Sequence, residues 1–279
     1  MGFSIHQPQS TVNHHLGPVR ASCEQAAATR CNVDQLIQTF TPISLEDSAK
    51  AALMNRSEAK FVCHVDTLLE MLPRLRQDYF VLEIDGGRAM GYRSLYLDTP
   101  DFALYMAHHN GKPSRYKVRY RHYLYTDTVF FEVKVREKGR TRKERVKLEN
   151  DSDWSHNLPK DFFAAQRPLE RRVLEPKLEV WCRRITLVGK HSAERLTIDL
   201  DLAYGLPESH LQPGFANLVI LELKYSGKDT TFLPLAHQLQ LRGQSFSKYS
   251  VGCGLLYPNL KANAFKPQRL AIERIENHA

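Results

Sequence analysis

The stretch KPSRYKVRYRHYLYTDTVFFEVKVREKGRTRKERVK, residues 112–147, decides the fold of this chain. It contains thirteen Lys or Arg residues against four Asp or Glu residues. In the run RYKVRYR, residues 115–121, every odd position is basic and every even position is Tyr or Val. A period of two is typical of a β-strand that has one cationic face and one apolar face.

The same alternation returns in the next two runs of the chain. Residues 129–137 place Glu132 and Lys134 on one face and valines on the other, and residues 143–147 alternate again after the turn at Gly139. A sheet face that lies in water is a common alternative for any one of these strands. Three consecutive strands with mostly basic polar faces are unusual, because like charges opposite each other on neighbouring strands repel. We therefore expect something anionic to lie on this face.

Composition limits the class of protein. With 279 residues, 42% of them hydrophobic, the chain can bury a sizeable core, and one large β domain with an extension fits better than two equal domains. A formal charge of +8 and a pI near 9.2 favour an anionic partner. The five cysteines are widely spaced and form no CxxC motif, which favours a reducing compartment. We find neither a signal peptide nor an apolar run of the roughly 18 residues that a membrane helix needs. The sequence predicts a soluble, cytoplasmic protein.

Three segments are expected along the chain. Residues 1–55 are predicted to be an N-terminal extension, a polar tail followed by weak helices over 22–40 and 44–54, the first with Ser22 and Gln25 in capping-box spacing. Residues 56–260 form the predicted main domain. Residues 261–279 are predicted to be a charged C-terminal tail.

Helices inside the main domain are predicted from caps and prolines. Thr67 and Glu70 have capping-box spacing for a helix that Pro73 would interrupt or end. Further helices are expected over 161–173 and 235–242, and the segment SFSKYSVGCG, residues 245–254, has the composition of a loop.

Eight strands are predicted, over residues 58–63, 90–98, 115–123, 129–137, 143–148, 178–187, 195–202 and 218–225. Their short connections favour antiparallel neighbours, and eight strands can close into a barrel wide enough for side chains and a ligand. Charged faces that point inward would form a cationic tunnel, whereas charged faces that point outward would form a basic sheet surface. Periodicity alone does not distinguish these two arrangements.

The order of motifs along residues 56–255 resembles the VTC domain of polyphosphate polymerases, a branch of the triphosphate tunnel metalloenzymes. The motifs are KF, SLYLDTPD, YKVRYR, FEVK, TRKERV, RRITL, TIDLDL, LELKY and FSKYSVG. The resemblance implies an α+β fold, an eight-stranded antiparallel β-barrel tunnel with flanking helices. It also implies Mn²⁺ or Mg²⁺ as cofactor, and ATP and inorganic polyphosphate as partners, with the terminal phosphoryl of ATP transferred onto the growing chain.

The resemblance also assigns residues to roles. Six cations are expected to grip the reacting phosphates: Lys60, Lys117, Arg119, Lys134, Arg184 and Lys248. Four more are expected in cofactor binding: Lys143 and Arg145, which also match phosphate-gripping positions of the family, and Arg121 and Lys224, which lie on the same predicted strand faces. Glu222 matches the metal-binding glutamate of the family. Glu58 and Glu132 lie on the same predicted faces as the matched residues, and both are expected to be further metal ligands. Tyr96 and Asp98 are left open between structural and functional roles.

Two positions depart from the family pattern. Ser245 stands where the family can carry a second lysine before the FSK lysine, and Arg56 replaces the first glutamate of the Glu-x-Glu-x-Lys opening of related triphosphatases. Two other functions are considered. One is a triphosphatase for inorganic or organic triphosphates, and the other is a non-catalytic binder of polyphosphate, inositol phosphates or nucleic acid. No nucleic acid is expected, because an eight-stranded lumen is too narrow for duplex DNA.

Overall fold

The computed structural model describes residues 23–50, 56–148, 159–164, 169, 172–207, 209 and 214–277. A ten-stranded sheet forms its body, and eight of the strands follow one hydrogen-bonded, antiparallel path. In spatial order these are β2 (Ser57–His64), β10 (Leu218–Tyr225), β9 (Glu194–Gly205), β8 (Glu175–Gly189), β4 (Ala89–Asp98), β5 (Arg115–Tyr123), β6 (Thr128–Glu137) and β7 (Arg140–Lys147). They correspond to the eight predicted strands, and the predicted fold class is confirmed.

Two short strands extend the sheet beyond that path. The strands β1 (Thr41–Ile43) and β3 (Tyr79–Leu82) pair in parallel, and β3 also pairs with β8. The sequence did not predict them, because three or four residues are too few for a period of two to show.

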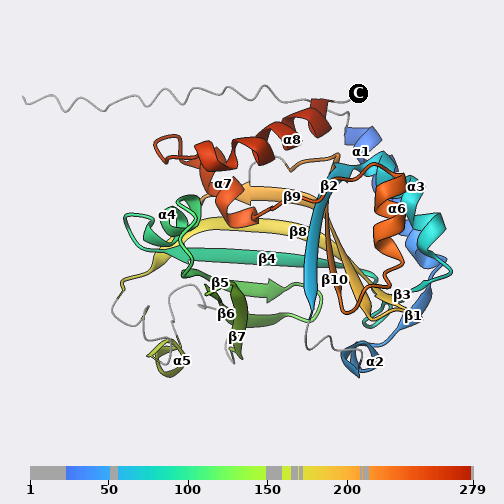
Figure 1. The fold of residues 1–279 in the computed structure, drawn as a ribbon, viewed down its shortest axis with the longest axis horizontal. Coiled ribbons are helices and arrows are strands. Elements are labelled where there is room, and N and C mark those ends of the chain that lie inside the picture. Colours follow the sequence, from blue (N-terminus) through green and yellow to red (C-terminus); the bar gives the residue numbers. More distant parts are fainter. Residues whose placement is uncertain are drawn as a thin grey trace, which may run out of the picture.

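The sheet is strongly curled. In Figure 1, β2 and β10 run steeply across the direction of β4, β8 and β9. The charges of Glu58 and Lys60 on β2 act on the pKa of Lys134 on β6, although five strands separate β6 from β2 along the path. Only a curled sheet brings these residues together, so the eight strands form a half-barrel with an enclosed concave face. Among the described residues no ladder joins β2 to β7.

Apolar side chains cover the convex face of the half-barrel. One cluster packs α1 (Cys23–Gln38), α3 (Val65–Leu75) and α6 (Phe232–Gln238) onto β2, β8, β9 and β10. A second cluster on β4, β5 and β6 includes Phe131 and packs against Phe163 of α5 (Lys160–Ala164). The apolar faces of the strands therefore point outward to the helices, and the charged faces point inward.

Helices also close one end of the concave face. A third cluster joins Tyr96 and Leu178 of the sheet to α7 (Lys248–Leu256) and α8 (Lys266–Asn277), which lie at the top of Figure 1. The helix α4 (Ala103–His109) lies beside α7, at the left of the figure. The short helix η1 (Asn263–Phe265) precedes α8. The lumen, as used below, is the charged remainder of the concave face.

A β-bulge on β9 separates two aspartates that the sequence alternation placed on one face. The β8–β9 register shifts between Trp181 and Arg183, and Asp201 has a φ of 52°. Asp199 consequently faces the lumen, while Asp201 binds Arg183 and Arg30 on the side covered by α1. The bulge re-aims the strand, as bulges commonly do beside functional sites.

Several helix boundaries differ from the sequence prediction. His64 caps α3 through Nδ1, which accepts a hydrogen bond from the Asp66 backbone, so the predicted cap at Thr67 is wrong, and α3 runs through Pro73 to Leu75. Residues 248–256 form α7 and not a loop. The helix predicted over 44–54 is described as α2 (Leu45–Lys50), and the predicted Ser22 cap lies outside the described residues.

The end of the chain is anchored to the sheet. In α8, which falls within the predicted C-terminal tail, Ile272 is buried, and the Glu276 carboxylate accepts hydrogen bonds from the backbone of Ala216, Asn217 and Leu218. The three predicted segment boundaries themselves remain a prediction. Within the described part of the chain, no helix is both long and apolar enough to cross a membrane.

Candidate functional site

Three lysines face one another across neighbouring strands of the lumen. Lys117 of β5 lies opposite Lys134 of β6, which lies opposite Lys143 of β7. Burial lowers the pKa of Lys117 to about 7 and that of Lys143 to about 8, and it also lowers the pKa of Lys134. Lys134 adds to the effect on Lys117 through its own charge. A row of like charges in this position is unfavourable unless an anion lies among them.

Three carboxylates hold six cations in place, one of which is Lys143 of the lysine row. Glu132 binds Arg119 and Lys143, Asp199 binds Arg184 and Lys248, and Glu222 binds Lys60 and Lys224. Burial alone would raise the pKa of each carboxyl, but the bound cations outweigh burial and hold all three pKa values below their usual range. These side chains are ionised at neutral pH, and their ion pairs fix the directions of the cations.

Four of the predicted site cations have no carboxylate partner in the described part of the chain. Lys117 donates to Ser247 Oγ at 2.8 Å, and no ion pair is found for Lys134. Arg121 lies 5.5 Å from the centre of the Tyr92 ring and is only 8% exposed, while Arg145 lies 4.6 Å from the centre of the Phe130 ring. Arginines stacked on aromatic rings keep their N–H groups free to bind an anion.

The predicted metal ligands do not form one cluster. Glu58 and Glu222 lie together on β2 and β10, where both contact the Lys60 ammonium, at 2.9 and 3.4 Å. Glu132 lies on β6, where Arg119 and Lys143 occupy its two oxygens. No group of three His, Cys, Asp or Glu side chains converges anywhere in the described residues. Mg²⁺ commonly uses one or two carboxylates together with substrate phosphates, and Glu222 with Glu58 fits that requirement.

Sequence reasoning missed one functional residue and left two open. Asp199, 2% exposed, links the predicted Arg184 and Lys248, and its place in the alternating run TIDLDL was the only available signal. Tyr96 belongs to the site, because its hydroxyl accepts a hydrogen bond from Arg119 at 2.9 Å. Asp98 is structural, since its oxygens accept hydrogen bonds from the backbone at the start of α4 and from the hydroxyl of Tyr249.

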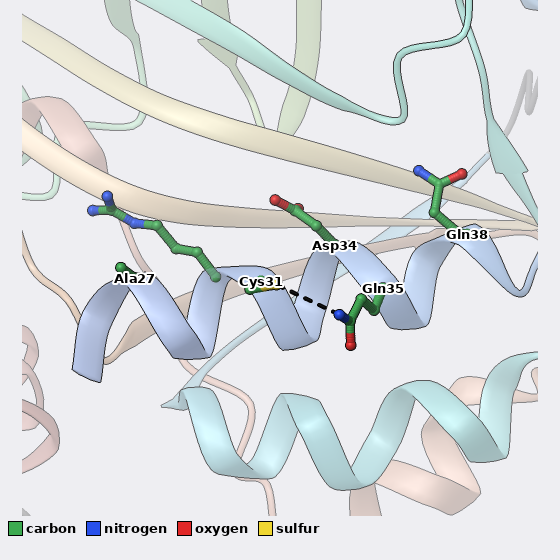
Figure 2. Close-up of a pocket in the computed structure, with 6 residues that line it drawn as sticks. Ala27, Cys31, Asp34, Gln35 and Gln38 are labelled. Carbon is green, nitrogen blue, oxygen red and sulfur yellow. Dashed lines mark hydrogen bonds between the residues drawn. The ribbon is translucent and has the colours of Figure 1, made fainter. Parts of the chain in front are cut away.

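The structure also has a surface groove along α1, away from the lumen. Figure 2 shows it, with the hydrogen bond from Gln35 Nε2 to Cys31 Sγ at 3.5 Å. Its lining residues are Ala27, Arg30, Cys31, Asp34, Gln35 and Gln38, all from one helix. None of the predicted site residues lines this groove, and we assign it no role.

Comparison with known proteins gives one family match. A family model of the VTC domain matches residues 55–257. No curated protein sequence matches this chain.

Solved structures resemble the chain only distantly. A candidate adenylate cyclase of Bacillus halodurans has 13% identity and a TM-score of 0.49, covering 73% of this chain and 100% of its own. The PH1819 protein of Pyrococcus horikoshii has 14% identity and a TM-score of 0.41, with 71% and 97% covered. A candidate adenylyl cyclase of Hippeastrum, described as having a dominant triphosphatase activity, has 12% identity and a TM-score of 0.43, with 71% and 96% covered. At these values the likenesses add nothing to the family match.

Proposed function

The chain belongs to the VTC domain family, and we propose that it is a polyphosphate polymerase whose reaction takes place in the lumen. The terminal phosphoryl of ATP would pass to the terminal oxygen of an inorganic polyphosphate chain, ADP would leave, and the chain would grow by one unit. The observation that carries the proposal is the row of Lys117, Lys134 and Lys143 on three neighbouring strands, of which only Lys143 has a carboxylate partner, Glu132, among the described residues.

The lumen suits phosphoryl transfer because that reaction needs little covalent help from a protein. It needs the attacking and leaving oxygens in line and cations against the equatorial oxygens of the transferred group. The lysine row supplies point charges, and Arg121 and Arg145 supply guanidinium groups that can bind two oxygens each. These cations act more strongly in the partly enclosed lumen than on an open surface, because less water screens them. Arg119 and Arg184 are held in fixed directions by their ion pairs with Glu132 and Asp199.

A divalent metal, Mn²⁺ or Mg²⁺, would be held by Glu222 with Glu58 beside it. When bound there, it would act as a Lewis acid on the phosphates and offset charge at the leaving group. Lys60 and Lys224 form ion pairs with the Glu222 carboxylate in this structure.

Transfer is favoured over hydrolysis by the state of the lumen carboxylates. Hydrolysis requires a positioned and activated water, commonly with the help of several carboxylates and a second metal. Glu132 and Asp199 are each bound by two cations, so neither has a free oxygen suited to act as a base. We therefore place the triphosphatase second.

We further infer a cytoplasmic location, with ATP and polyphosphate as the partners. Among the described residues, Cys31, Cys63, Cys182 and Cys253 are all free thiols, as expected in a reducing compartment.

The test is to incubate the protein with ATP and Mn²⁺ and to stain the products for polyphosphate after gel electrophoresis. A polymerase gives a ladder of chains, whereas free phosphate without chains would support the triphosphatase. Lys134→Met should abolish the ladder, because it removes the central charge of the lysine row. Lys190→Met is the matched control, since Lys190 lies outside the lumen beside Phe80 and its loss should leave the ladder unchanged.

A further inference from the structure

Three aromatic side chains lie together at one end of the lumen. Tyr123 follows Lys117 and Arg121 on the inward face of β5, with a period of two. Tyr123 lies opposite Tyr92 of β4, and Phe130 of β6 lies opposite Arg121, so all three rings belong to the inward face. The ring centroids of Tyr92 and Tyr123 are 4.9 Å apart, and those of Tyr123 and Phe130 are 5.4 Å apart. None of the three is among the site residues predicted from the sequence.

These rings are more accessible than the other aromatic pair of the concave face. Tyr96 and Tyr249 stack on each other beneath α7 and are only 5% and 2% exposed. Tyr92, Tyr123 and Phe130 are half-buried, and their rings meet edge to face and not in a stack. No cation lies over the Tyr123 ring in the part of the chain that the structure describes. A ring of this kind offers a stacking surface to a planar ligand.

Arginines lie between the three rings and the lysine row. The guanidinium carbon of Arg121 lies 5.5 Å from the centre of the Tyr92 ring, and that of Arg145 lies 4.6 Å from the centre of the Phe130 ring. Along β6, Phe130 and Lys134 are four residues apart, which is about 13 Å at ~3.3 Å per residue. Both arginines fall within that interval on the neighbouring strands. The lumen therefore changes from cationic to aromatic along its length.

We propose that Tyr92, Tyr123 and Phe130 bind the base of a nucleoside triphosphate, which lies with its base on these rings and its terminal phosphate at the lysine row. The inference rests on the proposed function and deepens it, because it gives the donor nucleotide one direction in the lumen. The order of rings, arginines and lysines matches a ligand that has a planar base at one end and anionic phosphates at the other. Stacking uses the face of the base, which every base has. The rings therefore recognise nucleoside triphosphates as a class.

The experiment measures the affinity of the full chain for two ligands by calorimetry at pH 7. One is the β,γ-imido analogue of ATP, and the other is inorganic tripolyphosphate, which has the phosphates without the base. Tyr123→Leu should weaken binding of the analogue about tenfold, the loss of one base–aromatic stack, and should change tripolyphosphate binding by less than about twofold. Phe130→Leu is an independent variant with the same expected result. Tyr123→Phe should bind both ligands as the wild type does, because it keeps the ring.

Tyr125→Leu is the matched control. Tyr125 lies in the turn between β5 and β6, is 46% exposed, and donates its hydroxyl hydrogen to the Asp85 carbonyl at 2.6 Å, so neither affinity should change. Wild-type affinity for the analogue in both leucine variants, or equal losses for the two ligands, would overturn the inference. The proposed function would stand in that case if the wild type still made polyphosphate from ATP. If the wild type binds neither ligand, both the inference and the proposed function fail.

Discussion

Lys117 is held close to its own titration point, because burial and the neighbouring cations lower its pKa to about 7. A bound phosphate favours the charged form, so binding above pH 7 requires the uptake of a proton. We predict that the affinity for tripolyphosphate falls between pH 7 and pH 9, by up to about tenfold per pH unit. Lys117→Arg should make this dependence smaller, because arginine stays charged over the whole range, and the remainder comes from Lys143, whose pKa is lowered to about 8. Calorimetry at pH 6.5, 7.5 and 8.5 measures both profiles, and identical slopes for the two proteins would contradict the assignment.

Charged Lys117 should lower the free energy of unfolding when the lumen holds no anion. The folded pKa of Lys117 lies below its unfolded value, so the unfolded chain binds more protons between about pH 7 and pH 10 and stability rises with pH across that window. The cost is fully present below pH 7. Lys117→Met should therefore raise the free energy of unfolding at pH 6.5 by about 1–3 kcal/mol in phosphate-free buffer. Urea denaturation measures the gain, which should disappear near pH 10.

Substitution of Glu222 should separate the binding of phosphate from its activation. Glu222→Gln keeps the shape of the side chain and removes the charge proposed to hold the metal. We predict that Mn²⁺-dependent synthesis falls by at least about a hundredfold, as expected when a metal ligand is lost, while the affinity for tripolyphosphate changes little. Parallel measurements of rate and affinity test this. Synthesis at the wild-type rate in Glu222→Gln would rule out the metal site at Glu222 and Glu58.

At the level of elements, α7 determines where Ser247 and Lys248 meet the lumen. Its Gly252 lies so close to the sheet that an added Cβ would be 2.6 Å from atoms of both Leu178 and Tyr204. Gly252→Ala should push α7 away from the concave face, lower the unfolding free energy by about 1–3 kcal/mol, and weaken tripolyphosphate binding at the same time. Gly254→Ala on the same helix is the control, since its nearest neighbour would be Ala262 Cβ at 3.2 Å. Equal effects of the two substitutions would contradict the packing argument.

The elements that the sequence predicted well are those whose signal is local. A strand with one charged and one apolar face shows its period of two directly, so all eight strands of the main path could be recognised. Helix α7 could not, because its sequence KYSVGCGLL contains two glycines and no amphipathic pattern. Its helical form depends on packing against Leu178 and Tyr204, which lie far away in the sequence.

At the scale of the whole molecule, the sequence predicted the lumen cations but not their partners. The alternation identified Lys117, Lys134 and Lys143 as residues of one face, and the observed register places them directly opposite one another. Which cations pair with Glu132, Asp199 and Glu222 was not predictable, because the pairing depends on strand order and on the bulge at Asp201.

A crystal structure of the chain with tripolyphosphate tests the central claim most directly, namely that the concave face of the half-barrel binds phosphate. The account predicts phosphate groups among Lys117, Lys134, Lys143 and Arg121, with the ion pair of Arg119 and Glu132 still in place. Tripolyphosphate bound only on the convex face or at the edge of the sheet, with the lumen lysines far from any phosphate, would contradict it.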